Sequence, residues 1–152
     1  MSHLAYGRGL SLLSNGLFAS TTLTVAVVTL PSLKRCKDPI PVFTRTLERG
    51  GKLAVSSMLV SSICHFYIYY KTRNRQALWC GLLSFISVPY SIVFLLPINK
   101  QILALDRKSA VAPPDAVANS QFIDLIAQWG SLHWFRVVAS NVAFIMNVFS
   151  SV

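Results

Sequence analysis

Acidic side chains are scarce in this chain, and none lies within its long apolar runs. Only 5 of the 152 residues are Asp or Glu, against 14 Lys and Arg. Charged residues make up 12% of the sequence and hydrophobic residues 53%. This balance is typical of integral membrane proteins rather than of soluble globular ones. It also excludes a di-iron carboxylate bundle, which needs Glu side chains inside its helices.

Cysteine is also rare, and the usual signatures of metal and phosphate sites are missing. Cys36, Cys64 and Cys80 have no CxxC spacing, so the sequence predicts no disulfide framework. It contains no HExxH, no glycine-rich phosphate loop, no GxSxG and no N-x-[ST] glycosylation motif. The sequence therefore predicts no metal ligands from a motif, and the functional candidates are the few polar residues within the apolar runs.

What the sequence does contain is four long apolar runs, which predict four membrane-spanning helices. The expected spans cover about residues 10–30, 53–70, 78–100 and 132–148. A hydrocarbon core of about 30 Å is crossed by about 17 to 25 helical residues. Each run is polar along one face, which we expect to face the other helices. We therefore predict an all-α fold, a single integral membrane four-helix bundle over residues 1–152, with both termini on one side.

The third run is the longest, and prolines make it irregular. Pro89 interrupts it, and Pro97, Asn99 and Lys100 close it. A proline inside a span frees a carbonyl and bends the helix, which is tolerated where protein groups satisfy the freed carbonyl. We expect this bend to face protein.

Two connecting segments have helical patterns of their own. VFTRTLERGGK, residues 42–52, is expected to form a surface helix that stops at Gly50 and Gly51. In NSQFIDLIAQWG, residues 119–130, apolar side chains surround a single Asp124. This pattern favours a short interfacial helix in the loop between the third and fourth spans. The alternative is a plain continuation of the last span.

Basic residues are concentrated in the short segments between the apolar runs. Lysine and arginine in such places lie beside anionic head groups, so the net charge of +9 indicates membrane lipids rather than nucleic acid as a partner. The first and third connections hold more basic residues than the N-terminal tail and the second connection. The positive-inside rule then predicts that both termini face away from the cytosol.

Arg136 is the strongest candidate for a functional residue, because it lies one turn inside the fourth run. A charged side chain at the centre of a span costs on the order of 2.5–3.5 kcal/mol, so it needs a partner. A buried guanidinium can hold a phenolate or carboxylate through paired hydrogen bonds. The alternative is that Arg136 extends toward the lipid head groups.

Two histidines and one asparagine are further candidates. His133 lies three residues before Arg136, and a neutral imidazole there can take a proton from an acidic C–H or O–H group. His65 lies deeper, in the second run, and is a second candidate base. The alternative for each is a histidine with a purely structural hydrogen bond. Asn99 can donate to an oxyanion or an enolate, or it can cap the helix end near Pro97.

Four stretches are similar to the DUF1772 family of membrane proteins, whose named members are fungal anthrone oxygenases. They are the first run ending at Pro31, TLERGGK, VPYSIVFLLPINKQIL and WGSLHWFR, and their order and spacing extend the resemblance over nearly the whole chain. The resemblance implies oxidation of an anthrone by dioxygen to an anthraquinone and water. It points to Asn99, His133 and Arg136. Together with the residues singled out above, this gives our first hypothesis, in which His133 or His65 is the base and Arg136 plus Asn99 hold the substrate anion.

The implied reaction uses dioxygen as a co-substrate and has no fixed cofactor requirement. An anthrone carbanion is electron-rich enough to react with dioxygen without a prosthetic group, if the protein supplies a base, an anion stabiliser and a dry pocket. A metal ion held by His65 and His133 is the alternative. The implied partners are a small hydrophobic aromatic substrate and enzymes of a secondary metabolite pathway, in the endoplasmic reticulum or another endomembrane.

Two other functions are compatible with the same residues. One is a non-catalytic membrane protein that binds or scaffolds a hydrophobic pathway intermediate. The other is a non-oxidative isomerase or cyclase built on the same frame. Both would leave dioxygen unconsumed, which distinguishes them from an oxygenase.

Overall fold

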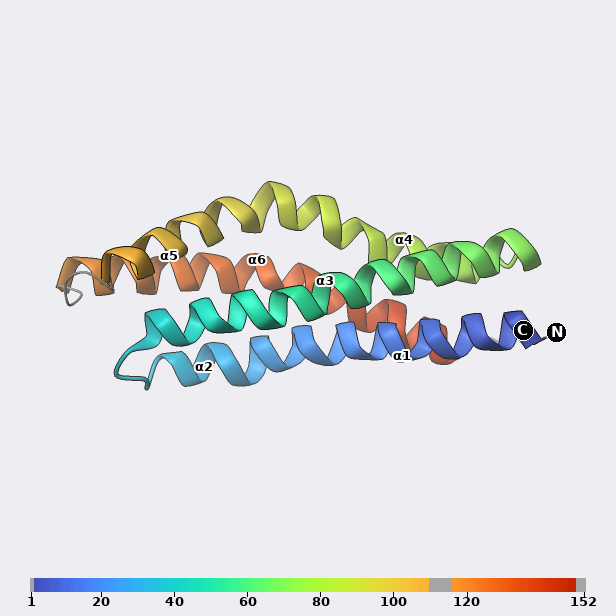
Figure 1. The fold of residues 1–152 in the computed structure, drawn as a ribbon, viewed down its shortest axis with the longest axis horizontal. Coiled ribbons are helices and arrows are strands. Elements are labelled where there is room, and N and C mark those ends of the chain that lie inside the picture. The colour runs from blue at the N-terminus through green and yellow to red at the C-terminus, as the bar shows by residue number, and fades with distance from the viewer. Residues whose placement is uncertain (1, 110–115, 150–152) are drawn as a thin grey trace.

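The computed structural model describes residues 2–109 and 116–149, and these are almost entirely helical. The elements form four long rods in chain order (Figure 1). The first rod is α1, η1 and α2, the second is α3, the third is α4, η2 and α5, and the fourth is α6. Their bounds are α1 Ser2–Thr24, η1 Val25–Thr29, α2 Leu30–Leu33, α3 Pro39–Thr72, α4 Arg75–Tyr90, η2 Ser91–Leu95, α5 Leu96–Ser109 and α6 Ala116–Val148.

The four rods lie side by side, and the start of α1 and the end of α6 are at the same end of the molecule (Figure 1). Helix α1 packs against α3 and α6, and α4 packs against the same two helices. Within the described residues, three rods are long and apolar enough to cross a membrane: His3–Leu33, Pro39–Thr72 and Arg75–Ser109. The all-helical prediction is confirmed, and three of the four expected spans fall within these rods.

The predicted stop at Gly50 and Gly51 is wrong, because α3 runs through both glycines without a break. Neither glycine has a positive φ, so both adopt ordinary right-handed helical backbone. Local glycine preference argues for a helix end. Here the packing of α3 against α1 and α4 outweighs that preference.

The predicted short interfacial helix is not a separate element in the described part of the chain. Residues 119–130 belong to α6, which is continuous from Ala116 to Val148. The structure therefore has the alternative arrangement, in which this segment continues into the last rod. The amphipathic pattern is explained by packing: Phe122 and Ile126 are buried in the apolar core.

The third rod bends where the sequence places Pro89, and it bows away from the other rods (Figure 1). The π-helical turn η2 follows directly, and Ser91 Oγ donates to Ser87 O at 2.6 Å. Tyr90 reaches the neighbouring helix, where its hydroxyl donates to Leu132 O at 3.0 Å. A polar contact to α6 therefore supports the bend.

The interior changes character along the rods. At the end with the α2–α3 connection, the core is apolar and aromatic, and Phe43 packs edge-to-face with Phe122 and Trp129. Toward the termini, the interior is lined by small hydroxyl residues, as the polar faces predict. The buried hydroxyl residues there are Ser11, Ser14, Thr22, Ser57, Ser61, Ser62, Ser84, Ser87 and Ser140. The candidate site lies where these two regions meet.

Candidate functional site

A small cavity lies between α1, α3 and α6, and two of the predicted site residues line it. We call it the His133 cavity. Its volume is about 40 Å³, and its wall includes His133 and Arg136 of α6, Thr22 of α1, and Gly50 and Gly51 of α3. Since these positions are distant in sequence, only the packing of three helices creates the cavity.

Arg136 is inside the protein, with an exposed fraction of 9%. Its guanidinium carbon lies 5.6 Å from the centre of the Phe18 ring, within cation–π range. Its Nε is buried and has no hydrogen-bond partner in the described part of the chain. A guanidinium in this position has donor capacity left for an anionic ligand.

His133 is held from both sides, and its exposed fraction is 3%. Its Nε2 lies 3.0 Å from Thr22 O. A backbone carbonyl only accepts hydrogen bonds, so Nε2 carries the hydrogen and donates. The neutral ring then has its lone pair on Nδ1, which is buried without a partner among residues 2–109 and 116–149. His133 therefore has a nitrogen ready to accept a proton.

The orientation of the His133 ring is fixed by Trp129, one turn earlier on α6. The two rings stack with centroids 4.5 Å apart and planes 15° from parallel. The indole Nε1 of Trp129 in turn donates to Asn99 Oδ1 at 2.8 Å. Asn99 is thus connected to His133 through Trp129, and it does not line the His133 cavity.

His65 lies in a different part of the interior. Its Nδ1 donates to Ser61 O at 2.7 Å, within the same helix, and its Nε2 is buried without a partner among the described residues. His65 follows Gly51 by 14 residues in α3, which corresponds to about 21 Å along the helix axis. The structure therefore does not bring His65 and His133 together, and one metal ion cannot bind both.

No cluster of three or more His, Cys, Asp or Glu side chains that could hold a metal ion occurs in the described ranges. Of the four site residues predicted from the sequence, His133 and Arg136 line one cavity, and His65 and Asn99 lie outside it. The sequence does not reveal every residue of the site. It does not identify the partners Thr22 and Phe18. Sequence spacing could have identified Trp129, because it lies four residues before His133 and therefore on the same helix face. The Thr22 contact uses a backbone carbonyl 111 residues away, which no side-chain pattern reveals.

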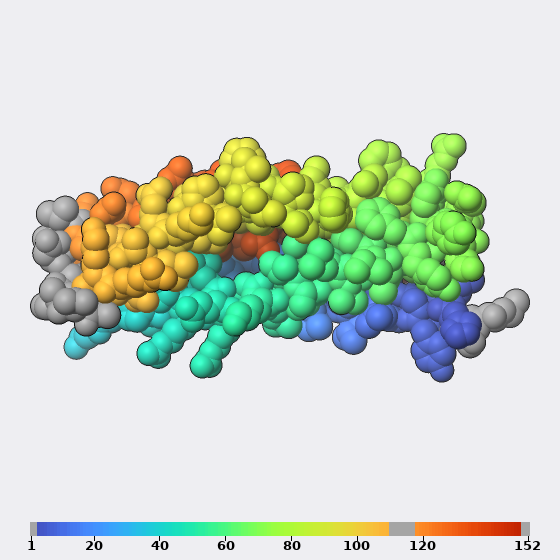
Figure 2. Space-filling view, turned by 45° about the horizontal axis from the view of Figure 1, so that its top comes forward, coloured from blue at the N-terminus to red at the C-terminus, as the bar shows by residue number. Residues whose placement is uncertain are grey.

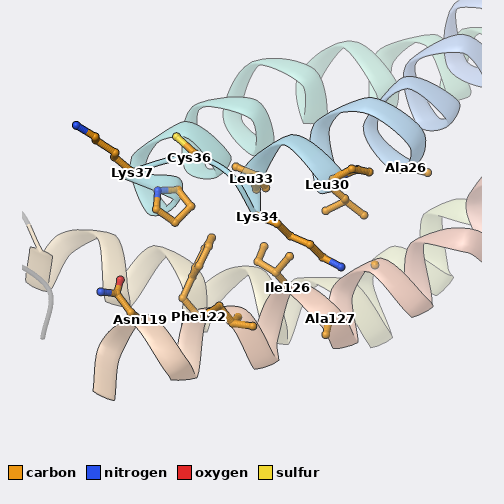
Figure 3. A pocket seen from close by; sticks show the side chains of 14 residues that line it. Ala26, Leu30, Leu33, Lys34, Cys36, Lys37, Asn119, Phe122, Ile126 and Ala127 are labelled. Atoms are coloured by element: carbon orange, nitrogen blue, oxygen red, sulfur yellow. The ribbon is translucent and has the colours of Figure 1, made fainter. Parts of the chain in front are cut away.

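A larger groove lies between the end of the first rod and the first half of α6 (Figure 3). We call it the Lys34 groove. Its volume is about 540 Å³, and its wall combines apolar side chains such as Phe122 and Ile126 with Lys34 and Lys37. None of the four predicted site residues lines this groove. It differs from the His133 cavity in both size and chemistry.

The fold and the site together define an all-helical protein with apolar helices of membrane-spanning length and a buried histidine and arginine beside one cavity. Residues 43–146 match the model of the anthrone oxygenase family. Since this match covers more than half of the sequence, the chain belongs to that family. All four predicted site residues lie within the matched range. No curated protein and no solved structure matches the chain.

Proposed function

We propose that this protein is a membrane-embedded oxygenase that oxidises an anthrone-like or other phenolic polyketide intermediate with dioxygen. Membership of the anthrone oxygenase family supports an oxygenase-like enzyme. The observation that carries the proposal is that His133 and Arg136 line one cavity, and that Nδ1 of His133 and Nε of Arg136 have no hydrogen-bond partner among the described residues. A base and an anion holder in one cavity are what this reaction requires.

The first step is removal of a proton from the anthrone methylene. The ketone in the same ring system acidifies this C–H bond, because the resulting negative charge is delocalised onto the carbonyl oxygen. Nδ1 of His133 accepts the proton, while Nε2–H stays bonded to Thr22 O. A positioned base of this kind contributes about 10²- to 10⁴-fold in rate.

Arg136 stabilises the anion that this step forms. Its donors hold the phenolate or enolate oxygen, and the neighbouring Phe18 ring keeps water away from the guanidinium. A charge interaction of this type is stronger in an apolar site than in water. Asn99 is expected from the sequence to bind the substrate anion, but it does not line the cavity, and we assign it a positioning role in which it holds Trp129 and hence the His133 ring.

Dioxygen then reacts with the electron-rich carbon. The carbanion adds dioxygen and regains the proton from His133, which gives a hydroperoxide on the former methylene carbon. Loss of water from this hydroperoxide gives the quinone carbonyl. The sum is one methylene plus one dioxygen to one carbonyl plus one water, so atoms and electrons balance without a further reductant.

We also propose a membrane topology, a compartment and partners for this protein. We place the chain as one domain of four spans, with α6 as the fourth, in the endoplasmic reticulum or another endomembrane with both termini away from the cytosol. The substrate is a small hydrophobic aromatic molecule supplied by pathway enzymes that associate with this protein. His65 is the alternative base, and its location beyond the His133 cavity makes it the weaker candidate.

A second function, binding a hydrophobic intermediate without oxidising it, is favoured by one observation. Pockets for drug-sized ligands measure about 300–1,000 Å³. The Lys34 groove, at about 540 Å³, falls in that range, whereas the His133 cavity holds about 40 Å³. The oxygenase proposal therefore requires the helices around the His133 cavity to separate when the substrate binds.

Oxygen uptake distinguishes the two functions. The purified protein in detergent is mixed with emodin anthrone, and dioxygen and quinone are followed together with the metal content of the sample. The proposal predicts uptake above the autoxidation rate, with one dioxygen consumed per quinone formed. Binding of the anthrone without excess uptake would establish the binding function and contradict the oxygenase.

A further inference from the structure

The glycines of this chain differ in what a Cβ atom added to each would meet. At Gly16, Gly81 and Gly130 the added atom would lie 3.1, 2.9 and 3.1 Å from the neighbouring side chain. These glycines allow close packing of helices, which is their usual role in membrane proteins. At Gly50 and Gly51 the added atom meets nothing within 4 Å.

Neither packing nor backbone conformation therefore explains Gly50 and Gly51. Both lie inside α3, and neither has a positive φ. A glycine inside a helix is less favourable than alanine, because it loses more backbone freedom on folding. Two adjacent glycines in the middle of a long helix thus destabilise α3, and no close contact with another helix compensates for this. The empty space beside them is the feature that needs an explanation.

Gly51 lies between the His133 cavity and the surface of α3. Gly50 and Gly51 line the cavity together with His133 and Arg136. Gly51 and Leu47 also border a shallow surface hollow of about 510 Å³ on α3. Figure 2 shows the surface hollowed at mid-length between α3 and the bowed third rod, with α6 visible at its floor. The two residues that line both the cavity and the surface hollow are Leu47, which has a side chain, and Gly51, which has none.

We propose that Gly50 and Gly51 form the entrance through which a planar phenolic substrate passes from the surface of α3 to His133 and Arg136. This inference rests on the proposed function and adds its route of access. Nε of Arg136 and Nδ1 of His133 are buried and have no hydrogen-bond partner in the described part of the chain, and this is the independent sign of a ligand at the inner end. A side chain at position 50 or 51 would occupy the route.

If Gly50 and Gly51 form an entrance, substitutions there should affect the stability and the activity of the protein differently. Gly50→Ala and Gly51→Ala remove a helix-weakening residue at sites with free space, so each raises the unfolding temperature or leaves it unchanged. Gly51→Leu and Gly51→Phe keep the fold but block the route. For Gly51→Phe we expect kcat/KM for emodin anthrone to fall at least tenfold, with an intermediate fall for Gly51→Leu.

Gly9 supplies the matched control. It also lies in a helix, and a Cβ atom there meets nothing within 4 Å, but it borders neither the His133 cavity nor the surface hollow. Gly9→Phe should change kcat/KM less than twofold. Wild-type kcat/KM in a folded Gly51→Leu or Gly51→Phe variant would overturn the entrance.

A binding measurement separates this inference from the proposed function. The association rate of emodin, a quinone of the product class, is measured without oxygen turnover in wild type, Gly51→Leu, Gly51→Phe and Gly9→Phe. Slower association in the two Gly51 variants alone supports the entrance, even if the wild type consumes no oxygen. Equal association rates in all four proteins contradict the entrance and leave the oxygenase assignment to its own test.

Discussion

Two buried histidines occupy this interior, and their surroundings differ. His133 is bonded to a carbonyl of another helix and stacked on Trp129, and it lines a cavity together with Arg136. His65 is bonded to a carbonyl of its own helix. A Cβ atom at Gly81 would lie 3.2 Å from His65 Cβ, so the helices are tightly packed there.

The difference shows what a reactive site needs beyond burial. Each ring has one nitrogen that is buried without a partner among the residues described. His133 lines a cavity together with the cation of Arg136, whereas the Cβ atom of His65 is tightly packed against α4. Space admits a reacting molecule, and the cation stabilises the anion that proton removal creates. We therefore assign chemistry to His133 and packing to His65, and the following predictions test that contrast.

Apart from substitution of His133 itself, the largest effect is expected for Arg136→Leu. Removing the donor that holds the developing anion should lower kcat by about 10²- to 10³-fold. Replacing a buried charge by an apolar side chain of similar length is often neutral or stabilising, so the unfolding temperature should not fall. Oxygen uptake and thermal unfolding of the same preparation check both expectations. Retained turnover in folded Arg136→Leu would remove Arg136 from the mechanism.

Asn99 should give a smaller effect, because it acts through Trp129. Asn99→Leu leaves the indole N–H of Trp129 without its acceptor. The lost hydrogen bond contributes about 1–1.4 kcal/mol. If this loss appears fully in the activation free energy, kcat falls about five- to tenfold. Asn99→Asp keeps the acceptor oxygen and removes the amide donor. If Asn99 positions Trp129, the Asp variant retains activity. If Asn99 instead donates to the substrate anion, the Asp variant is the less active of the two.

The smallest effect on activity is expected for His65→Asn. The amide of Asn can take over the hydrogen bond to Ser61 O, and the lost ring volume leaves a packing defect. The free energy of unfolding should fall by about 1–3 kcal/mol. Turnover per folded molecule should stay within about twofold of wild type. Chemical denaturation and oxygen uptake, each measured on the monodisperse fraction, provide the comparison.

The sequence predicts the helical architecture well where long apolar runs decide it. The rods contain every expected span segment, because a run such as residues 78–100 is too long and too apolar for other structures. The errors arise where a local signal competes with packing. Gly50 and Gly51 indicate a helix end, and residues 119–130 suit both an interfacial helix and a longer rod. Contacts between helices decide these cases, and a local pattern does not encode them.

The candidate site was predictable along α6 but not across helices. His133 and Arg136 share a helix face because they are three residues apart, so sequence spacing is sufficient to pair them. Their partners on α1, Thr22 and Phe18, depend on the register between two helices. The packing of α3 likewise decides that His65 lies about 17 Å of helix beyond Ala54, the nearest residue of the cavity wall on α3. A single sequence does not contain this information.

The measurement that tests the account most directly is the turnover of His133→Gln beside that of His65→Asn. Glutamine places an amide N–H close to the position of Nε2, so it can keep the bond to Thr22 O while removing the basic Nδ1. With emodin anthrone, the account predicts that His133→Gln loses about 10²- to 10⁴-fold in kcat, while His65→Asn remains close to wild type. Wild-type turnover in His133→Gln, or a loss confined to His65→Asn, would contradict it.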